Sequence, residues 1–357
     1  MSKFCPSCNT LIPNDSRQWS NKIYCSQKCR ISVFRKNKSA ATRAQQRRAN
    51  MRQNDEVLRL VRECRRAGTV QILTGHNLES FIETMKLVRE RPPGYVHLCH
   101  IAPVKGKWFV GLFHCKNLFY GGAYQNKRLG KKYIAGGLYI SHKDLKKKWR
   151  VDRNAPANEV LLKIEEFLGD IVQKYLEVTP VRKSKKYQII EKIIELEGGG
   201  DPERMMSLSH THLVNCLDKL CKKITPTKKY VSESKFIAYM DGLTRFISYR
   251  DDRLETFLAL RKILVISYMA LERVKKSKTY NKYFYVAYEP LVVKKYAYAM
   301  LADTKKWSEF KDFIYNTVFL ALQGHSPDLK IFRKEAMSYL KFPQSLEELV
   351  ARRVGRK

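Results

Sequence analysis

The chain has 357 residues, of which 44% are hydrophobic, and this is enough for two or three domains with apolar cores. It carries 69 Lys and Arg against 34 Asp and Glu, a formal net charge of +35. This excess predicts a polyanionic partner, and nucleic acid is the natural one because neutralising phosphates releases counterions. No apolar run of about 18 residues and no secretion signal occurs, so we expect a cytoplasmic protein that binds no membrane.

Two cysteine pairs near the amino terminus predict a zinc module over residues 1–36. Cys5 and Cys8 form the first pair, Cys25 and Cys29 form the second, and sixteen residues separate the pairs. Structural zinc takes four such ligands in a tetrahedron, and the short polar segment between the pairs needs a metal to organise it. The spacing resembles the small zinc ribbons and treble clefs, in which the second pair opens a helix. The alternative is four unrelated buried cysteines.

Residues 37–68 are interpreted as a basic helix or linker, because the stretch from Arg30 to Arg66 lacks proline and glycine. Its first half is polar on all sides, which favours contact with phosphates. The basic candidates there are Arg35, Lys36, Arg47 and Arg48. Its second half has Val57, Val61 and Cys64 at helical spacing, which predicts docking on a core. A solvated linker helix explains the first half equally well.

Residues 69–150 predict a small mixed domain. The expected elements are a strand over 69–74, a helix over 77–91, strands over 95–101 and 108–112, and a short basic helix over 123–129 after a Gly-Gly break. Two strands followed by a helix bring His100, at a strand end, close to the helix. An imidazole beside an oxygen ligand suits metal-assisted phosphodiester hydrolysis, because the imidazole accepts the proton of water and the metal stabilises the departing oxygen.

The segments HIAPVKG, VGLFHCKNL and QNKRLGKK resemble the HNH endonucleases, especially the form common in phage genomes. The resemblance covers residues 94–140 and implies a ββα core that cleaves DNA, in the host cytoplasm if a phage encodes the chain. It implies that His100 is the general base and that Asn117 holds the loop between the strands. It also implies that Asn126 binds Mg²⁺ or another divalent metal, and that Lys127 and Arg128 face phosphates.

One position departs from this family. Many members have an aspartate metal ligand before the histidine, where this chain has Cys99. A neutral thiol is a poor ligand for magnesium, which prefers oxygen. The alternative is therefore a non-catalytic, zinc-containing regulatory protein that binds DNA or RNA and keeps a degenerate HNH fold.

Basic residues and aromatics alternate after the expected ββα unit, and this mixture favours a nucleic-acid surface. The main candidates are Lys146, Lys147 and Lys148. Residues 151–357 are helical in pattern almost throughout. The expected fold is thus α+β: a zinc module, a basic helix, an HNH-like domain over 69–150 and a helical domain over 151–357. Double-stranded DNA is the favoured partner, and the sequence indicates no oligomeric state.

Overall fold

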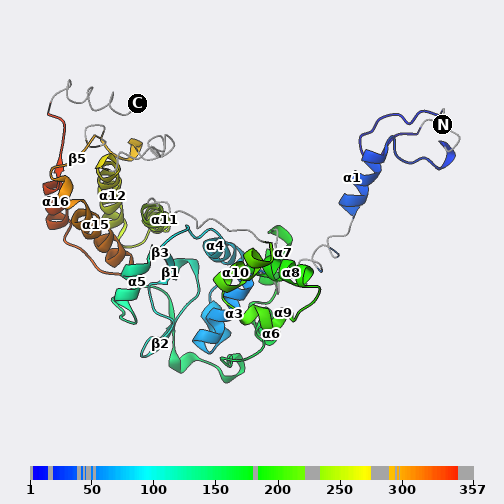
Figure 1. Ribbon diagram of the computed structural model, residues 1–357, viewed down its shortest axis with the longest axis horizontal. Helices are drawn as coiled ribbons and strands as arrows, with labels where there is room; N and C mark the ends of the chain where they lie inside the picture. Colours follow the sequence, from blue (N-terminus) through cyan, green and yellow to red (C-terminus); the bar gives the residue numbers. More distant parts are fainter. Residues whose placement is uncertain are drawn as a thin grey trace. The chain divides into compact units, whose positions relative to one another are not determined.

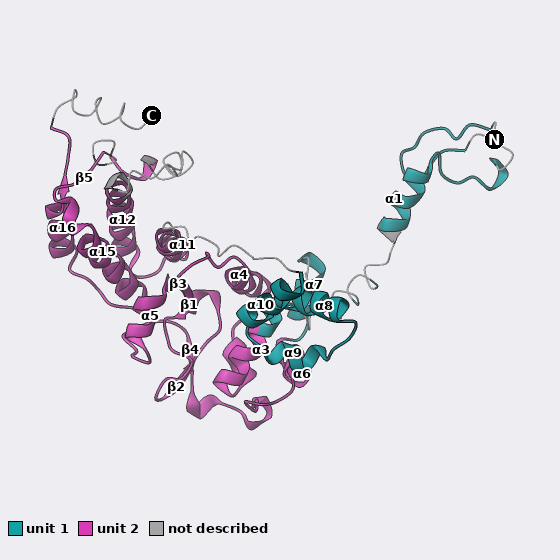
Figure 2. Cartoon of the chain, viewed as in Figure 1, with its two compact units in different colours: residues 1–58, 169–223 teal, residues 59–168, 224–357 magenta. Residues whose placement is uncertain are grey.

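The computed structural model describes residues 3–14, 19–37, 42, 45, 50, 54–179, 184–221, 234–274, 289–293, 296 and 298–344 (Figure 1). These residues form a mostly helical α+β fold with small two-stranded antiparallel sheets, which confirms the expected fold class. No helix in these ranges is both long and apolar enough to span a membrane. The chain divides into two compact units, residues 1–58 with 169–223 and residues 59–168 with 224–357 (Figure 2). These limits differ from the expected boundaries at 36, 68 and 150.

The first unit contains the amino-terminal module and a group of short helices. The module has a 3-10 turn, η1 (Trp19–Asn21), and the helix α1 (Gln27–Asn37). The later helices are α7 (Ile171–Val178), α8 (Lys185–Glu197), α9 (Pro202–Ser207) and α10 (His210–Cys221). Ser184 begins α8 by accepting a hydrogen bond from the Tyr187 amide, and Ile190, Ile193 and Leu213 form a small core between α8 and α10.

The second unit opens with helices that the sequence largely predicted. The helix α3 (Asp55–Ala67) begins in the first unit and ends in the second, where Gly68 adopts φ of 77° and closes it. The helix α4 (Leu78–Arg89) begins at a capping box between Asn77 and Ser80. The expected strand over 69–74 is wrong. It is the 3-10 helix η2 (Val70–Leu73), which Thr69 caps through the Gln71 amide.

A ββα unit is present, but its second strand is not the expected one. Strand β1 (Val96–His100) pairs antiparallel with β3 (Leu118–Gly122), which leads directly into α5 (Ala123–Leu129). The predicted strand over 108–112 exists as β2 (Phe109–Gly111), but it pairs with β4 (Tyr139–Ser141). The Gly-Gly pair that looked like a break lies inside β3. A Cβ on Gly121 would lie 2.9 Å from Cys99 Sγ, so this strand position requires glycine.

The remaining elements complete the second unit. Short 3-10 turns are η3 (Cys115–Asn117), η4 (His142–Asp144), η5 (Lys147–Trp149), η6 (Glu289–Leu291) and η7 (Thr304–Lys306). The helices are α6 (Ala157–Leu168), α11 (Ser234–Ser248), α12 (Leu254–Val274), α15 (Trp307–Leu322) and α16 (Leu329–Ser338). Strands β5 (Met300–Leu301) and β6 (Leu340–Lys341) pair antiparallel.

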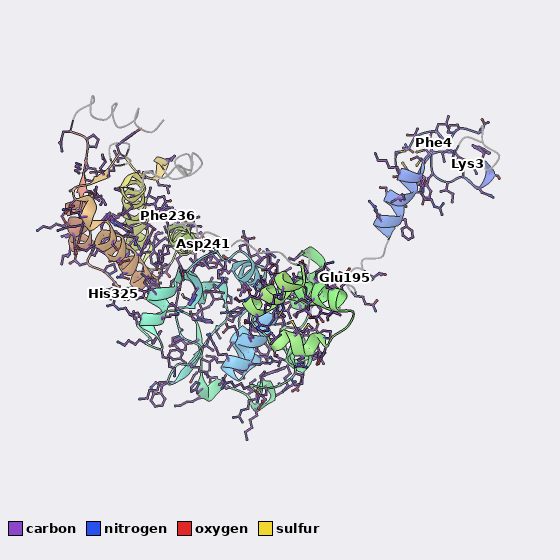
Figure 3. The ribbon with its side chains drawn as sticks, in the orientation of Figure 1. Lys3, Phe4, Glu195, Phe236, Asp241 and His325 are labelled. Atoms are coloured by element: carbon purple, nitrogen blue, oxygen red, sulfur yellow. The ribbon has the colours of Figure 1, made fainter. Side chains whose placement is uncertain are left out.

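The carboxy-terminal helices and the β1–β3 pair share one hydrophobic core. Phe119 of β3 packs against Phe319 of α15 with ring centroids 5.7 Å apart, and Cys99 lies in the same cluster. Tyr239 of α11 also contacts this strand pair, since its hydroxyl oxygen accepts a hydrogen bond from the Gly122 amide at 3.0 Å. Figure 3 labels Phe236 and Asp241 on the same helix, α11. The ββα unit is therefore part of the larger core and is not a separate small domain.

Candidate functional site

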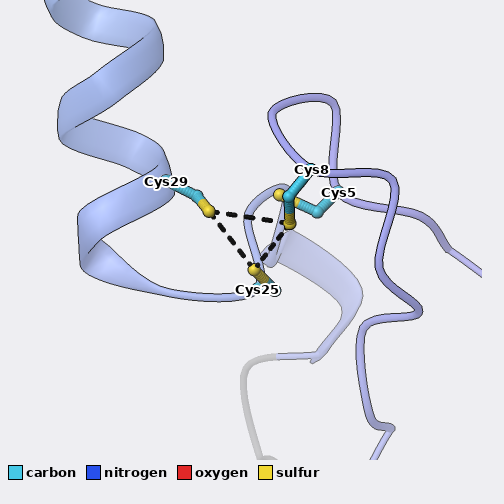
Figure 4. Close-up of side chains that lie close together, drawn as sticks. All are labelled: Cys5, Cys8, Cys25 and Cys29. Carbon is cyan, nitrogen blue, oxygen red and sulfur yellow. Dashed lines mark hydrogen bonds between the residues drawn. The ribbon is translucent and has the colours of Figure 1, made fainter.

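The four amino-terminal cysteines form one cluster (Figure 4). Their four sulfur atoms all lie within 4.8 Å of one another, and Cys8, Cys25 and Cys29 are separated pairwise by 3.4, 3.5 and 3.7 Å. A tetrahedral zinc ion with Zn–S bonds of about 2.3 Å places its sulfurs about 3.8 Å apart. The predicted clustering of the cysteines is confirmed, and the cluster fits a metal such as zinc.

Local backbone structure positions the cysteines. The first pair lies on a tight turn, in which the Cys5 amide bonds the Thr10 carbonyl at 2.9 Å and Asn9 adopts a positive φ of 56°. The second pair opens α1, because Ser26 Oγ accepts the Cys29 amide at 3.2 Å in the first helical turn. The turn and the start of α1 thus bring the two cysteine pairs together, as the sequence predicted.

The thiols share protons in a way that suits metal binding. A hydrogen bond from the Cys25 backbone lowers the pKa of the Cys5 thiol to about 6. Hydrogen bonds to the Cys8 and Cys29 side chains raise the pKa of the Cys25 thiol to about 12. Cysteine binds metals as the thiolate, so a divalent cation would displace these shared protons.

Asn117 makes the backbone contacts that the resemblance implied for it. Its side chain is fully buried in η3, within the long loop between β1 and β3. Its Oδ1 accepts the amides of Ala102 and Leu138 at 2.9 and 3.1 Å. Its Nδ2 donates to the carbonyls of Ala102 and Leu112 at 3.2 and 2.7 Å. The amide thereby joins two stretches of this loop to the backbone just before β4 and uses its full bonding capacity.

His100 ends β1, as predicted, and its ring lies 6.0 Å from that of Phe113. Its Nε2 is buried and has no hydrogen-bond partner among the described residues. Burial, followed by the fields of Arg66 and Arg59 on α3, lowers the pKa of His100 well below its ordinary value. The imidazole is therefore neutral at pH 7, which a general base requires.

The imidazole that contacts Asn126 belongs to His97. Asn126 Nδ2 on α5 lies 3.2 Å from His97 Nδ1 on β1. His97 and His100 are three residues apart on one strand, so their side chains leave opposite faces. The structure thus pairs Asn126 with His97, where the sequence led us to expect His100. Successive side chains of a strand alternate between its two faces, so His97 shares a face with Cys99, and His100 lies on the other face. This alternation could have indicated which histidine contacts Asn126.

The donors around Asn126 do not fit magnesium. Cys99, at the usual aspartate position, is buried in the aromatic core, and burial raises the pKa of its thiol to about 12. Each charged group whose field acts on His97 is a cation, namely Arg91, Lys127 or Arg59. Apart from the cysteine cluster, the described residues contain no group of three or more His, Cys, Asp or Glu side chains placed to hold a metal. Magnesium prefers oxygen ligands, and carboxylates are missing from this set.

A strongly basic exposed segment runs from residue 105 to residue 150. It holds twelve Lys and Arg and a single acid, Asp144, and all twelve basic side chains are exposed. They are Lys105, Lys107, Lys116, Lys127, Arg128, Lys131, Lys132, Lys143, Lys146, Lys147, Lys148 and Arg150. One of them, Lys148, forms an ion pair with Glu166 at 2.7 Å. Eleven cations in this segment have no ion pair to an acid within the described residues.

Exposed aromatic rings lie among these cations. Trp108 is 71% exposed beneath Lys107, whose Nζ is 4.9 Å from the ring. Phe109 on β2 packs against Tyr139 on β4 at 4.6 Å, and the Tyr139 ring is half exposed. The β2–β4 ribbon and the residues just before it therefore offer flat rings and positive charge side by side.

The other predicted phosphate contacts lie in the amino-terminal region. Arg35 is exposed on α1, and Lys36 follows it in the same helix. Arg47 and Arg48 lie outside the described residues. No family model matches this chain, and no curated protein or solved structure matches it either.

Proposed function

We propose that the protein binds double-stranded DNA through the basic segment, residues 105–150. The observation that carries this proposal is the exposure of twelve Lys and Arg side chains with one acid among them. Such a charge density repels itself and is relieved when a polyanion neutralises it. Phosphates distributed along a duplex provide that neutralisation, and the released counterions favour binding.

The β2–β4 ribbon favours DNA over double-stranded RNA. The major groove of B-form DNA is wide enough for a two-stranded ribbon, whereas that of A-form RNA is too narrow for side chains to read. Exposed Trp108 and Tyr139 on the ribbon can contact bases or sugars.

Competition binding tests this proposal. We expect a labelled DNA duplex to bind with an affinity that falls steeply as the KCl concentration rises, and a DNA duplex to compete better than an RNA duplex of the same sequence. If the RNA duplex competes better, the protein is an RNA-binding protein and the proposal of DNA binding is wrong. Affinity that ignores salt would refute binding through phosphates.

Hydrolysis of the DNA is a second candidate function. Its support is the ββα unit itself, with a neutral His100 at the strand end and Asn117 bonded to the loop. In that reaction the His100 imidazole would take a proton from water as the water oxygen attacks phosphorus, and the bond from phosphorus to the departing sugar oxygen would break, with that oxygen taking up a proton. The buried thiol of Cys99 favours the alternative, a protein that binds DNA without cutting it.

Incubation with supercoiled plasmid separates these alternatives. Hydrolysis predicts nicked circles with at least one of Mg²⁺, Mn²⁺, Ni²⁺ and Zn²⁺. His100→Ala should abolish nicking and leave DNA affinity unchanged, because the basic segment is intact. A folded wild-type protein that binds the plasmid and never nicks it would leave DNA binding as the function.

We also propose that the metal of the cysteine cluster is zinc. The sulfurs of Cys8, Cys25 and Cys29 are 3.4–3.7 Å apart, and all four sulfurs lie within 4.8 Å of one another, as a small tetrahedral ion bound by four thiolates requires.

A further inference from the structure

At the junction of β1 and α5, the side chain of an asparagine contacts that of a histidine. Asn126 Nδ2 faces His97 Nδ1 at 3.2 Å. An amide nitrogen can only donate, so His97 Nδ1 accepts this bond. A neutral imidazole that accepts at Nδ1 carries its proton on Nε2. The free nitrogen of His97 is therefore an N–H donor.

That donor is available to a ligand. His97 is half-buried, and its Nε2 has no hydrogen-bond partner among the described residues. Because Nδ1 accepts the bond from Asn126, it carries no proton, and the ring is neutral in the tautomer that Asn126 selects.

Two exposed cations adjoin the residues next to the imidazole. Arg91 Nη1 lies 3.4 Å from the carbonyl of Val96, the residue before His97. Lys127 follows Asn126 on α5. Both side chains are exposed, and neither forms an ion pair to an acid within the described part of the chain. A neutral donor with two exposed cations on neighbouring segments suits an anion with several acceptor oxygens.

We propose that His97, Arg91 and Lys127 bind one phosphate of the nucleic-acid backbone, and that Asn126 is the positioning residue that orients the His97 ring. The proposal rests on the proposed DNA binding and gives it a defined site. It also changes the interpretation of Asn126, which holds an imidazole that donates to an anion and does not ligate a metal.

Binding of a short DNA duplex, measured by fluorescence anisotropy over a range of KCl concentrations without added divalent metal, tests the site. His97→Ala should weaken binding about tenfold and leave the salt slope unchanged, because a neutral donor releases no counterion. Lys127→Ala should reduce the slope by about one. His97→Gln, which keeps an N–H donor, should restore part of the affinity. The control is His325→Ala, an exposed histidine after α15 (Figure 3), which should bind as the wild type does.

Nitrogen-15 spectra of the histidines test the same site without relying on affinity. We expect wild-type His97 to show the Nε2–H tautomer, and Asn126→Ala to lose that preference. Added duplex or inorganic phosphate should shift the His97 signals and leave those of His325 unchanged. A shift with duplex alone identifies the polymer backbone as the ligand. The assignment of a DNA backbone phosphate as the ligand would be overturned if inorganic phosphate shifts the His97 signals and the His97→Ala variant still binds DNA as tightly as the wild type.

Three results separate the two proposals. If the wild type does not bind DNA, the proposed function fails, and the phosphate titration alone decides whether an anion site exists. If the wild type binds and a stably folded His97→Ala binds equally well, the phosphate site is refuted and DNA binding stands. If His97→Ala is unfolded by circular dichroism, His97→Gln and Lys127→Ala carry the test.

Discussion

Asn117 has no exposed surface, and its amide joins two stretches of the loop between β1 and β3 to the backbone just before β4. Asn117→Ala would leave the buried backbone groups of Ala102 and Leu112 and the part-buried amide of Leu138 without this partner. Each such group costs about 1–3 kcal/mol, so we expect the free energy of unfolding to fall by about 3 kcal/mol or more. Urea denaturation followed by circular dichroism measures this change.

The matched control is Asn126→Ala, which removes the same amide from a half-buried position on α5. We expect it to cost less than about 1 kcal/mol. Equal stability of the two variants would show that other contacts hold the loop.

Individual residues differed in how well the sequence predicted their surroundings. The cysteine cluster followed from spacing alone, because zinc fixes the number and type of its ligands. The resemblance placed Asn117 in the loop with its backbone contacts. The contact of Asn126 with His97 was not predicted, because two histidines on one strand look alike until the face of each is known.

At the scale of the element, the amino-terminal module should depend on its metal. Its described part buries few apolar side chains, among them Cys5 and Ile12, so it has little core of its own. We expect the purified protein to contain one zinc with Zn–S distances of about 2.3 Å by X-ray absorption. Chelation, or Cys25→Ser, should unfold this module.

The helices α11, α12 and α15 serve as the internal control, because none of the four clustered cysteines lies in their core as the structure describes it. Their amide signals should be unchanged after chelation. Loss of both sets of signals would contradict independent folding of the module.

Elements defined by local patterns were predicted well, and those defined by partners were not. Capping at Asn77 and closure at Gly68 depend on neighbouring residues, and both helices were found. The strand β3 was missed because its two glycines look like a turn. The need for glycine at position 121 comes from a residue distant in the sequence, because Phe319 leaves no room there for a side chain.

At the scale of the whole molecule, the charge excess should appear in the salt dependence of binding. Replacing Lys146, Lys147 and Lys148 together by alanine should reduce the slope of log affinity against log salt by about two to three. Lys148 should contribute the least, because Glu166 already neutralises it at 2.7 Å. Anisotropy titrations at several KCl concentrations give the slope.

An equal change of charge elsewhere provides the comparison. Lys305, Lys306 and Lys330 are exposed near α15 and α16, outside the basic segment. Their replacement by alanine should leave the slope nearly unchanged. If both triple variants lose the same slope, net charge and not the basic segment governs binding.

The shared core of β1, β3 and the carboxy-terminal helices has a consequence for the order in which the chain is made. Gln323, directly after the end of α15, donates to the His100 carbonyl, and Arg245 of α11 donates to the carbonyls of Cys115 and Leu118. A ribosome releases the ββα unit long before it synthesises these partners. In the nascent chain the hairpin therefore leaves Phe119 uncovered. We expect chains arrested before residue 234 to bind chaperones or to be sensitive to protease. We expect both properties to be lost once α15 has emerged.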